Sequence, residues 1–178
     1  MPKLRVFTLA ALLALPAAVP ASPLLQLPVE DLHGKASTLA DAIAGRPAVL
    51  VVGFTRASSR PATAWSRRLR ADRDLVGRVQ LFQVVVLEQV PGLFRGMVVR
   101  SIRNDVPEPL HDQFLVVGKR SDDWKQLLEY TDGDVAYLAL ADPQRGLLWH
   151  HAGPPGDAAH AALVTAAAEL ATPDPREE

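Results

Sequence analysis

Apolar runs and amphipathic stretches alternate along this chain and predict a mixed arrangement of strands and helices. Residues 48–54 form a continuous apolar run of strand length, which indicates a β-strand buried on both faces of a sheet, and residues 79–87 predict the next strand. Residues 59–73 lie between them with helical spacing, since Trp65 and Leu69 are four positions apart and share a face. Further elements are expected towards the C-terminus: a helix over residues 91–105, a strand over 112–117, a helix with Ser121 as its N-cap, a hairpin of 134–142 and 146–153, and a last helix from Asp157.

The segment before the first apolar run predicts smaller elements. It reads as a short extended stretch, a turn at residues 33–35 and a short helix that Thr38 can cap, with Gly45 and Pro47 ending that helix. Strands alternate with helices early, and a hairpin and a helix close the chain. The predicted fold class is therefore α/β, with a central mixed β-sheet flanked by helices on both faces.

Both ends of the chain differ from the rest in composition. Residues 1–21 begin with the basic stretch MPKLR, continue with an apolar run and end in small residues, which is the order of a secretory signal peptide. We expect cleavage after Ala21, one mature domain over residues 22–172 and a polar tail over 173–178. The apolar run is short for a membrane span, and an uncleaved anchor is the alternative. The predicted location is the periplasm or another exported compartment.

Composition restricts the classes of function. With 178 residues, 48% of them hydrophobic and 22% charged, the chain is expected to be a soluble globular protein. Its formal net charge of −1 gives no electrostatic reason to expect a nucleic-acid partner. The chain contains no cysteine, which excludes disulfides, thiolate metal sites and thiol nucleophiles.

The first candidate site is VVGFTRASSRPATAW, residues 51–65, where an apolar strand runs into a Ser- and Arg-rich loop before a helix. The start of a helix offers free backbone N–H groups and a partial positive charge, and two arginines raise the local potential. This arrangement predicts a binding site for a carboxylate, a phosphate or an acidic peptide. The alternative is a solvated loop in which Ser59 only caps the helix. The candidate binding residues are Thr55, Arg56, Ser58, Ser59, Arg60 and Pro61.

The second candidate surface is the predicted helix over residues 91–105, where apolar residues alternate with Arg95, Arg100 and Arg103. A basic amphipathic helix is typical of contacts with an acidic partner or, peripherally, with lipid headgroups. Arg100 and Arg103 are the candidate binding residues here. The alternative is a helix that covers the sheet and holds its arginines in water.

Two kinds of enzyme stand as alternatives to a binding function. A nucleophilic Ser59 needs a nearby base such as His111 or His150, and the chain has no G-x-S-x-G motif. A metal site through His111, His150 and His160 is the second, although ordinary surface histidines are the simpler interpretation. His150 and His151 are adjacent on a predicted strand and point to opposite faces, which makes a poor chelate. We predict no catalytic residues, no metal and no cofactor.

Residues 51–63 and the hairpin YLALADPQRGLLW carry a resemblance to a known fold. They are similar to the thioredoxin fold of exported TlpA-like reductases and peroxiredoxins, where the first core strand continues into a motif similar to VVNFWATWCPPCR. In the alignment the two cysteines fall on Ser59 and Ala62, and Pro61 is kept. Val135 and Ala136 are the nearest positions to a cis proline that faces the cysteines in those families. The resemblance implies a thioredoxin-like domain without thiol-disulfide oxidoreductase or thiol peroxidase activity.

Two longer stretches, residues 95–117 and 136–153, carry a second resemblance. They are similar to the thioredoxin-like assembly factors of the mitochondrial ATP synthase and their bacterial relatives, which are described as lacking a working thiol pair and as chaperones for a membrane subunit. The matching positions are Arg100, Ile102, Arg103, Pro107 and His111 in the first stretch, and Asp142, Gly146 and Trp149 in the second.

Together these patterns predict an exported, non-redox thioredoxin-like protein that works as a binding module. The expected role is that of an assembly factor, chaperone or adaptor, and the expected partner is another envelope protein or peptide. The alternative is a non-thiol enzyme on the same fold, either a hydrolase or one with a histidine metal site.

Overall fold

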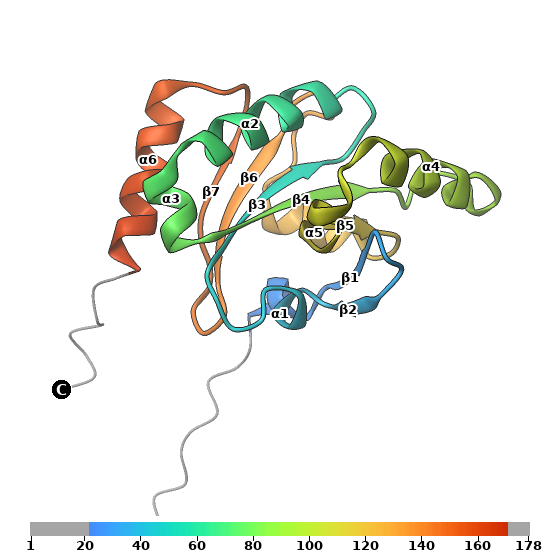
Figure 1. The fold of residues 1–178 in the computed structure, drawn as a ribbon, viewed down its shortest axis with the longest axis horizontal. Coiled ribbons are helices and arrows are strands. Elements are labelled where there is room, and N and C mark those ends of the chain that lie inside the picture. Colours follow the sequence, from blue (N-terminus) through green and yellow to red (C-terminus); the bar gives the residue numbers. More distant parts are fainter. Residues whose placement is uncertain (1–21, 171–178) are drawn as a thin grey trace, which may run out of the picture.

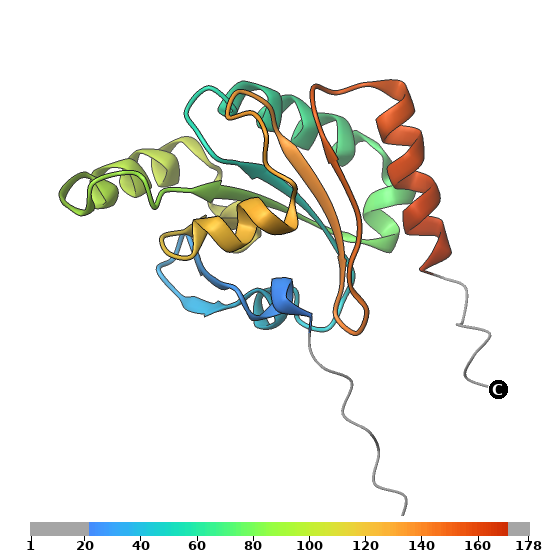
Figure 2. The same ribbon diagram turned by 180° about the vertical axis from the view of Figure 1, so that it is seen from behind.

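A single mixed β-sheet runs through the computed structural model, which describes residues 22–170. The sheet has seven strands in the order β2-β1-β5-β4-β3-β6-β7 (Figures 1 and 2). The predicted signal peptide over residues 1–21, the predicted tail over 173–178 and the last two residues of the predicted domain lie outside the described residues. The strands are β1 Pro28–Asp31, β2 Ala36–Thr38, β3 Ala48–Gly53, β4 Gln80–Val86, β5 Phe114–Val117, β6 Tyr137–Asp142 and β7 Gly146–Ala152.

The helices cover both faces of this sheet, so the predicted α/β fold class is confirmed. Side chains of α2, α3 and α6 pack on one face, and side chains of η1, α1 and α5 pack on the other. Helix α4 packs against the ends of β4 and β5 through a smaller apolar cluster. The helices are η1 Pro23–Gln26, α1 Leu39–Ala42, α2 Ser59–Ala71, α3 Arg73–Arg78, α4 Gly92–Asp105, η2 Glu108–Gln113, α5 Ser121–Leu127 and α6 Asp157–Glu169.

Strand β3 is the centre of the sheet, as its continuous apolar sequence predicts. It pairs parallel with β4 and antiparallel with β6, and all six of its residues are buried. Val49 and Val51 pack with α2 and α6, whereas Leu50 and Val52 face the cluster that holds α1 and α5. A strand covered on both faces has no polar side to alternate with, which explains the unbroken apolar run.

The predicted helix over residues 59–73 ends earlier, because Asp72 interrupts it. The backbone of Asp72 is extended, and its side chain accepts a hydrogen bond from the N–H of Leu75 at 3.0 Å, which starts α3. The prediction of Ser121 as an N-cap is also wrong. Arg120 is the N-cap residue, with a left-handed φ of 60°, and Ser121 is the first residue of α5. The Thr38 cap of α1 is confirmed, as part of a capping box with Asp41.

The turn predicted at residues 33–35 closes a hairpin of β1 and β2. The carboxylate of Asp31 accepts hydrogen bonds from the backbone N–H groups of His33 and Lys35, both at 2.9 Å. Gly34 has a φ of +89°, which favours glycine at this position. Strand β1 also pairs antiparallel with β5, far along the chain, and this pairing extends the sheet beyond β5.

The parallel strands β3, β4 and β5 end at the same edge of the sheet, here called the site edge. The loop before α2, the segment before α4 and the turn before α5 all lie at this edge (Figure 1). Strand β6 runs antiparallel to β3, so the segment that precedes it begins at the site edge as well. Four separate parts of the chain therefore lie at the site edge, where the resemblance described above places the thiol motif. No helix within residues 22–170 is both long and apolar enough to span a bilayer.

Candidate functional site

The first candidate site is the loop between β3 and α2, residues 54–58, together with the first turn of α2. Arg56, Ser59 and Arg60 are exposed, and Thr55 and Pro61 are half-buried. Ser58 is completely buried. The structure therefore keeps the predicted residues together but turns only some of them towards solvent.

Two hydroxyl groups close this loop on itself. The Ser58 hydroxyl donates to the carbonyl oxygen of Thr55 at 2.7 Å and accepts from the Thr55 N–H at 3.2 Å. The Thr55 hydroxyl accepts from the N–H of Ala57 at 3.1 Å and of Ser58 at 3.4 Å. A Cβ on Gly53, at the end of β3, would lie 2.9 Å from the Ser58 Oγ, so a larger residue there would displace the hydroxyl that closes the loop.

The Thr55 hydroxyl also joins the loop to the segment before β6. It donates to the carbonyl oxygen of Gly133 at 2.7 Å, across 78 positions of sequence. A Cβ on Gly133 would lie 2.8 Å from the Thr55 Cγ2, so the two segments can approach only because this residue is glycine. Val135 and Ala136 follow in the same segment, and every peptide bond among the described residues is trans. The facing position of the resemblance is thus present without its cis proline.

An aromatic cluster holds this facing segment in place. The buried Tyr137 hydroxyl accepts from the N–H groups of Thr131 and Asp132 and donates to the Asp132 carbonyl, each at 2.9 Å. The ring of Phe54 packs edge-on against Tyr130 at 4.9 Å and against Tyr137 at 5.3 Å between centroids. The segment before β6 and the loop are therefore fixed against one another by hydrogen bonds and by packing.

The loop leaves little for chemistry. The N–H groups of Thr55, Ala57 and Ser58 are hydrogen-bonded inside the loop, and that of Ser59 donates to the Arg56 carbonyl at 3.2 Å. The free N–H groups expected for an anion site are thus occupied at these positions, and the exposed charges of Arg56 and Arg60 remain. The N-cap position belongs to Ser58, whose side chain makes no capping bond, so Ser59 does not cap α2.

Neither enzymatic alternative has the set of neighbouring side chains that it needs within residues 22–170. No histidine or carboxylate there hydrogen-bonds to the hydroxyl of Ser58 or Ser59. The three histidines of the metal alternative contact different elements: His111 Nε2 lies 2.9 Å from the Val106 carbonyl, His150 lies 3.9 Å from Glu129, and His160 lies 3.2 Å from Asp72. No group of three or more potential ligands in the described part of the chain could hold a metal ion. His111 is buried, so the surface interpretation is wrong for it.

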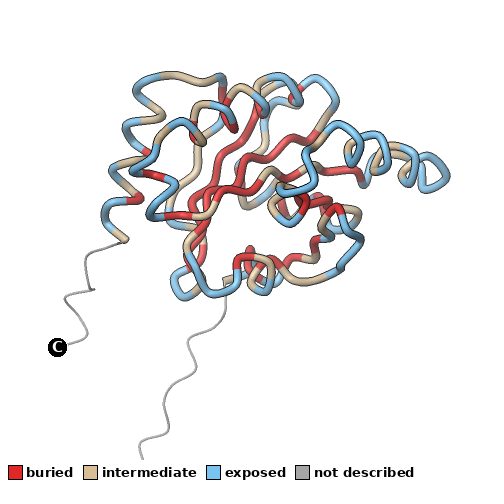
Figure 3. The backbone as a smooth tube through the Cα atoms, viewed as in Figure 1, coloured by how far each residue is buried: buried red, intermediate tan, exposed pale blue. Residues whose placement is uncertain are grey.

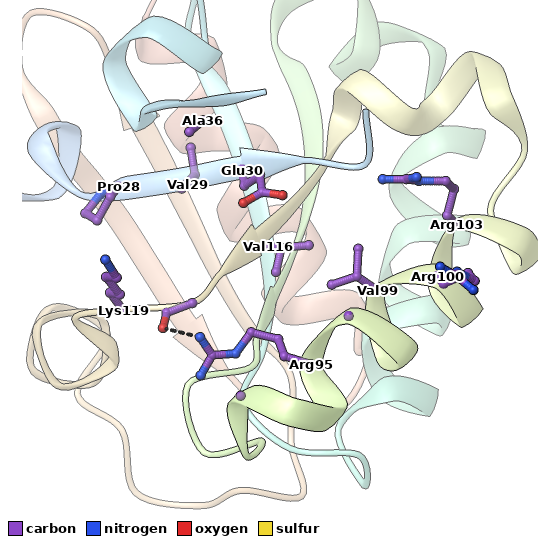
Figure 4. Close-up of a pocket in the computed structure, with 13 residues that line it drawn as sticks. Pro28, Val29, Glu30, Ala36, Arg95, Val99, Arg100, Arg103, Val116 and Lys119 are labelled. Carbon is purple, nitrogen blue, oxygen red and sulfur yellow. Dashed lines mark hydrogen bonds between the residues drawn. The ribbon is translucent and has the colours of Figure 1, made fainter. Parts of the chain in front are cut away.

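Arg100 and Arg103 lie apart from the loop, on α4. They line a groove of about 620 Å³ between α4, the β1–β2 hairpin and the end of β5, here called the α4 groove (Figure 4). Val29, Val99 and Val116 form apolar parts of its wall. The structure therefore divides the predicted site residues between the loop and the α4 groove.

Arg95 also borders the α4 groove, but its charge is engaged. Its guanidinium donates to the carbonyl oxygens of Gly118 and Glu88 at 3.2 Å and of Val90 at 3.3 Å, and Figure 4 shows the first of these bonds. Arg95 thereby ties the first turn of α4 to the ends of β4 and β5. Arg100, Arg103 and Lys119 are exposed, and none of the ion pairs within residues 22–170 includes them.

Helix α4 exposes large apolar side chains that the sequence interpretation did not single out. Leu93 is 88% exposed, Met97 69% and Phe94 52%, and no residue of α4 is fully buried (Figure 3). They lie in its N-terminal half, which projects from the body of the protein (Figures 1 and 2). A signal exists in the sequence: positions 93, 94 and 97 are apolar as well as 98, 99 and 102, and one helix face cannot bury both sets.

Glu88 links the segment before α4 to the start of α5. Its carboxylate accepts hydrogen bonds from the N–H of Ser121 at 2.6 Å and of Arg120 at 3.2 Å. The bonds to Ser121 hold the pKa of Glu88 below its usual value, since they favour the charged form. This carboxylate therefore takes the place of the Ser121 cap that the sequence predicted.

Comparison with known proteins identifies the fold. No protein-family model and no curated protein matches this chain. A candidate electron transfer protein from Aquifex aeolicus superposes with a TM-score of 0.55 at 14% identity, covering 80% of this chain and 88% of that one. The exposed lipoprotein thioredoxin Etrx1 of Streptococcus pneumoniae gives 0.51 at 14% identity, covering 78% and 97%. BsSco, of the Sco family of cytochrome c oxidase assembly proteins, gives 0.51 at 10% identity, covering 80% and 91%.

These likenesses show a thioredoxin-like fold, as the sequence predicted, in a chain without cysteine. Thiol-disulfide exchange requires a cysteine thiolate, and this chain has the fold but no cysteine to supply one. The relation to the ATP synthase assembly factors stays a prediction.

Proposed function

We propose that this protein is a non-redox thioredoxin-like binding module that holds another protein of the cell envelope, as an assembly factor, chaperone or adaptor. The observation that carries the proposal is the exposure of Leu93, Phe94 and Met97 at the projecting end of α4. Large apolar side chains gathered on a soluble surface mark contact sites, because water is a poor environment for them. The loop before α2, at the site edge, also offers the exposed arginines Arg56 and Arg60.

The closed loop supports binding over catalysis. Its hydroxyl groups are engaged with the backbone, and none is hydrogen-bonded to a group that could remove a proton. A rigid loop with outward charges suits recognition, because little conformational entropy is lost when a partner binds.

The envelope location and the assembly role rest on two sequence features and on the neighbours. Residues 1–21 have the order of a signal peptide, and residues 95–117 resemble the assembly factors. One neighbour of the same fold is an exposed lipoprotein, and another belongs to a family of assembly proteins.

Site-specific photo-crosslinking in intact cells tests the proposal. Benzoylphenylalanine replaces Phe94 in one variant and Arg56 in a second. A third places it at Gln144, which is exposed in the β6–β7 turn at the opposite end of the sheet. We expect one discrete crosslinked envelope protein from position 94, the same protein from position 56 with lower yield, and none from position 144.

Crosslinks of equal yield from all three positions would indicate nonspecific contact and would overturn the proposal. So would the absence of any crosslink from positions 94 and 56. Recovery of the full-length chain with residue 1 intact in the cytoplasmic fraction would overturn the envelope location alone.

A further inference from the structure

We infer that the α4 groove binds an acidic amphipathic helix of a partner protein. The inference rests on the proposed binding function and names the surface and the chemistry of the partner. The groove has a volume of about 620 Å³ and runs beside α4, whose 14 residues span about 21 Å. Its length and open form suit a helix laid along α4, a common mode of peptide recognition.

Charge gives the first argument. Arg100 and Arg103 border the groove from α4, and Lys119 borders it from the turn after β5 (Figure 4). These three cations have no ion-pair partner within residues 22–170. One carboxylate, Glu30, lines the groove against them. The groove therefore carries an excess of positive charge that a partner with Asp and Glu side chains would neutralise.

The apolar walls give the second argument. Val29 from β1, Val116 from β5 and Val99 from α4 line the groove; Val99 is half-buried, and Val29 and Val116 are buried. Leu93 and Met97 of the same helix lie outside the groove lining and add exposed apolar surface to α4. A partner must therefore offer apolar side chains along one face and carboxylates beside them, which describes an amphipathic helix.

Two glycines of α4 give the third argument. Gly92 and Gly96 line the groove one helical turn apart, and a Cβ added to either would meet no atom within 4 Å. Glycine inside a helix lowers its stability relative to alanine, and nothing in the described structure requires a glycine at position 96. The bare backbone on this side of α4 allows a second helix to approach closely.

Two other occupants fit less well. A second copy of this chain would bring the same cations to the same groove, and like charges would repel. A lipid surface needs its cations and apolar side chains on one projecting face, whereas Arg100, Arg103 and Lys119 surround a hollow that also contains Glu30.

The test uses two fluorescein-labelled peptides of about 14 residues, the length of α4. Both are designed helices with leucines on one face; the first has glutamates on the other face and the second has lysines. By fluorescence anisotropy, we expect the protein to bind the glutamate peptide at least about tenfold more tightly than the lysine peptide. The affinity should fall as salt is added, because the cations are exposed.

Three variants locate the site. The double substitution Arg100→Glu/Arg103→Glu should lower the affinity for the glutamate peptide at least about tenfold. The control Arg67→Glu/Arg73→Glu makes the same charge change at exposed positions of α2 and α3 and should keep the affinity within about twofold of the unmodified protein. Gly96→Ala should raise the melting temperature of the protein, because alanine favours the helix, and should nevertheless lower the affinity for the glutamate peptide. A variant that merely unfolds cannot give this pair of opposite effects.

Several outcomes would overturn the inference. These are equal affinity for the two peptides, no binding of the glutamate peptide up to about 1 mM, or unchanged affinity in both the arginine pair and Gly96→Ala. Arginine-dependent binding to phosphatidylglycerol vesicles without peptide binding would assign the groove to a membrane surface. A dimer in sedimentation that Arg100→Glu/Arg103→Glu dissolves would assign it to a second copy. If benzoylphenylalanine at position 94 still crosslinks to a specific envelope protein in these cases, the proposed function stands and only the groove assignment fails.

Discussion

The loop between β3 and α2 and the helix α4 lie at the same edge of one sheet, yet they are built in opposite ways. The loop is tied by the Thr55 and Ser58 hydroxyls to its own backbone and to Gly133, over a fully buried Tyr137. Helix α4 has no fully buried residue and leaves Leu93 almost completely exposed. The loop pairs its hydroxyl groups with atoms of the protein itself, whereas α4 leaves large apolar side chains in contact with water.

Under the proposed function, the loop stabilises the fold and the exposed end of α4 contacts the partner. The loop that leads to Ser59 and Ala62, the positions aligned with the thiol pair of the resembling families, is here a structural joint between two distant parts of the chain. Its hydrogen bonds contribute to the stability of the domain. The apolar end of α4 contributes little to that stability, so its side chains need another explanation, and the proposed binding function supplies one. Substitutions in the two regions should therefore act on different measurements.

The largest effect on stability is expected from Tyr137→Phe. Loss of the hydroxyl leaves the N–H groups of Thr131 and Asp132 without their acceptor, which should lower the free energy of unfolding by about 1–3 kcal/mol in urea titration. The matched control is Tyr130→Phe, whose hydroxyl makes no hydrogen bond within residues 22–170. Equal effects of the two substitutions would show that the hydrogen bonds of Tyr137 do not hold the facing segment.

Thr55→Val should have the next largest effect. It removes the bond to the Gly133 carbonyl and the acceptor of the Ala57 N–H, at an expected loss of about 1–2 kcal/mol. Ser59→Ala serves as the control, because Ser59 is exposed and does not cap α2. Thermal melting monitored by circular dichroism distinguishes the two. A larger loss from Ser59→Ala would show that the helix depends on a Ser59 cap after all.

Glu88→Gln should have a smaller effect that depends on pH. The folded-state pKa of Glu88 lies below its usual value of 4.5, so its carboxylate stabilises the fold above that pH and loses this contribution as pH falls through the folded pKa. At neutral pH the variant should be less stable by under about 1 kcal/mol, because the group is solvent-exposed. The difference from the unmodified protein should shrink when urea titrations are repeated at decreasing pH below 4.5. A constant or growing difference would contradict the bond to Ser121.

The smallest effect on stability is expected from Leu93→Gln/Met97→Gln. Both side chains are exposed on α4, so the free energy of unfolding should stay within about 0.5 kcal/mol. Crosslinking from position 56 should nevertheless fall, because the variant lacks the apolar contact surface. A large loss of stability would mean that this end of α4 belongs to the core, and the contrast between the two regions would then fail.

The sequence predicted those parts of the fold that local periodicity determines. Strand β3 was predictable because every position along it is apolar, and the hairpin of β6 and β7 because turn residues 142–146 separate two strand-like runs. The pairing of β1 with β5 was not, because no local pattern encodes which distant strands become neighbours.

The candidate site divides in the same way. The Ser- and Arg-rich loop could be located, since its place between a strand and a helix is a local feature. The hydrogen bond from Thr55 to Gly133 that closes the loop could not be predicted, because these two residues are 78 positions apart. The hydroxyl that closes the loop belongs to Ser58 and not Ser59, and neighbouring serines are indistinguishable until the backbone is known. The apolar end of α4 was visible in the sequence as a surplus of apolar positions for one helix face.

The central place of β3 has a consequence for synthesis. Ribosomes deliver the chain from its N-terminus, so β3 emerges before either of its neighbours in the sheet. Strand β4 follows after α2 and α3, but β6, which covers the other edge of β3, arrives only with residues 137–142. Until then a strand whose six residues all become buried presents an open edge, the kind of surface on which unfinished chains aggregate. The order of the strands along the chain thus sets how long this edge stays open, and it closes only when residues 137–142 have emerged.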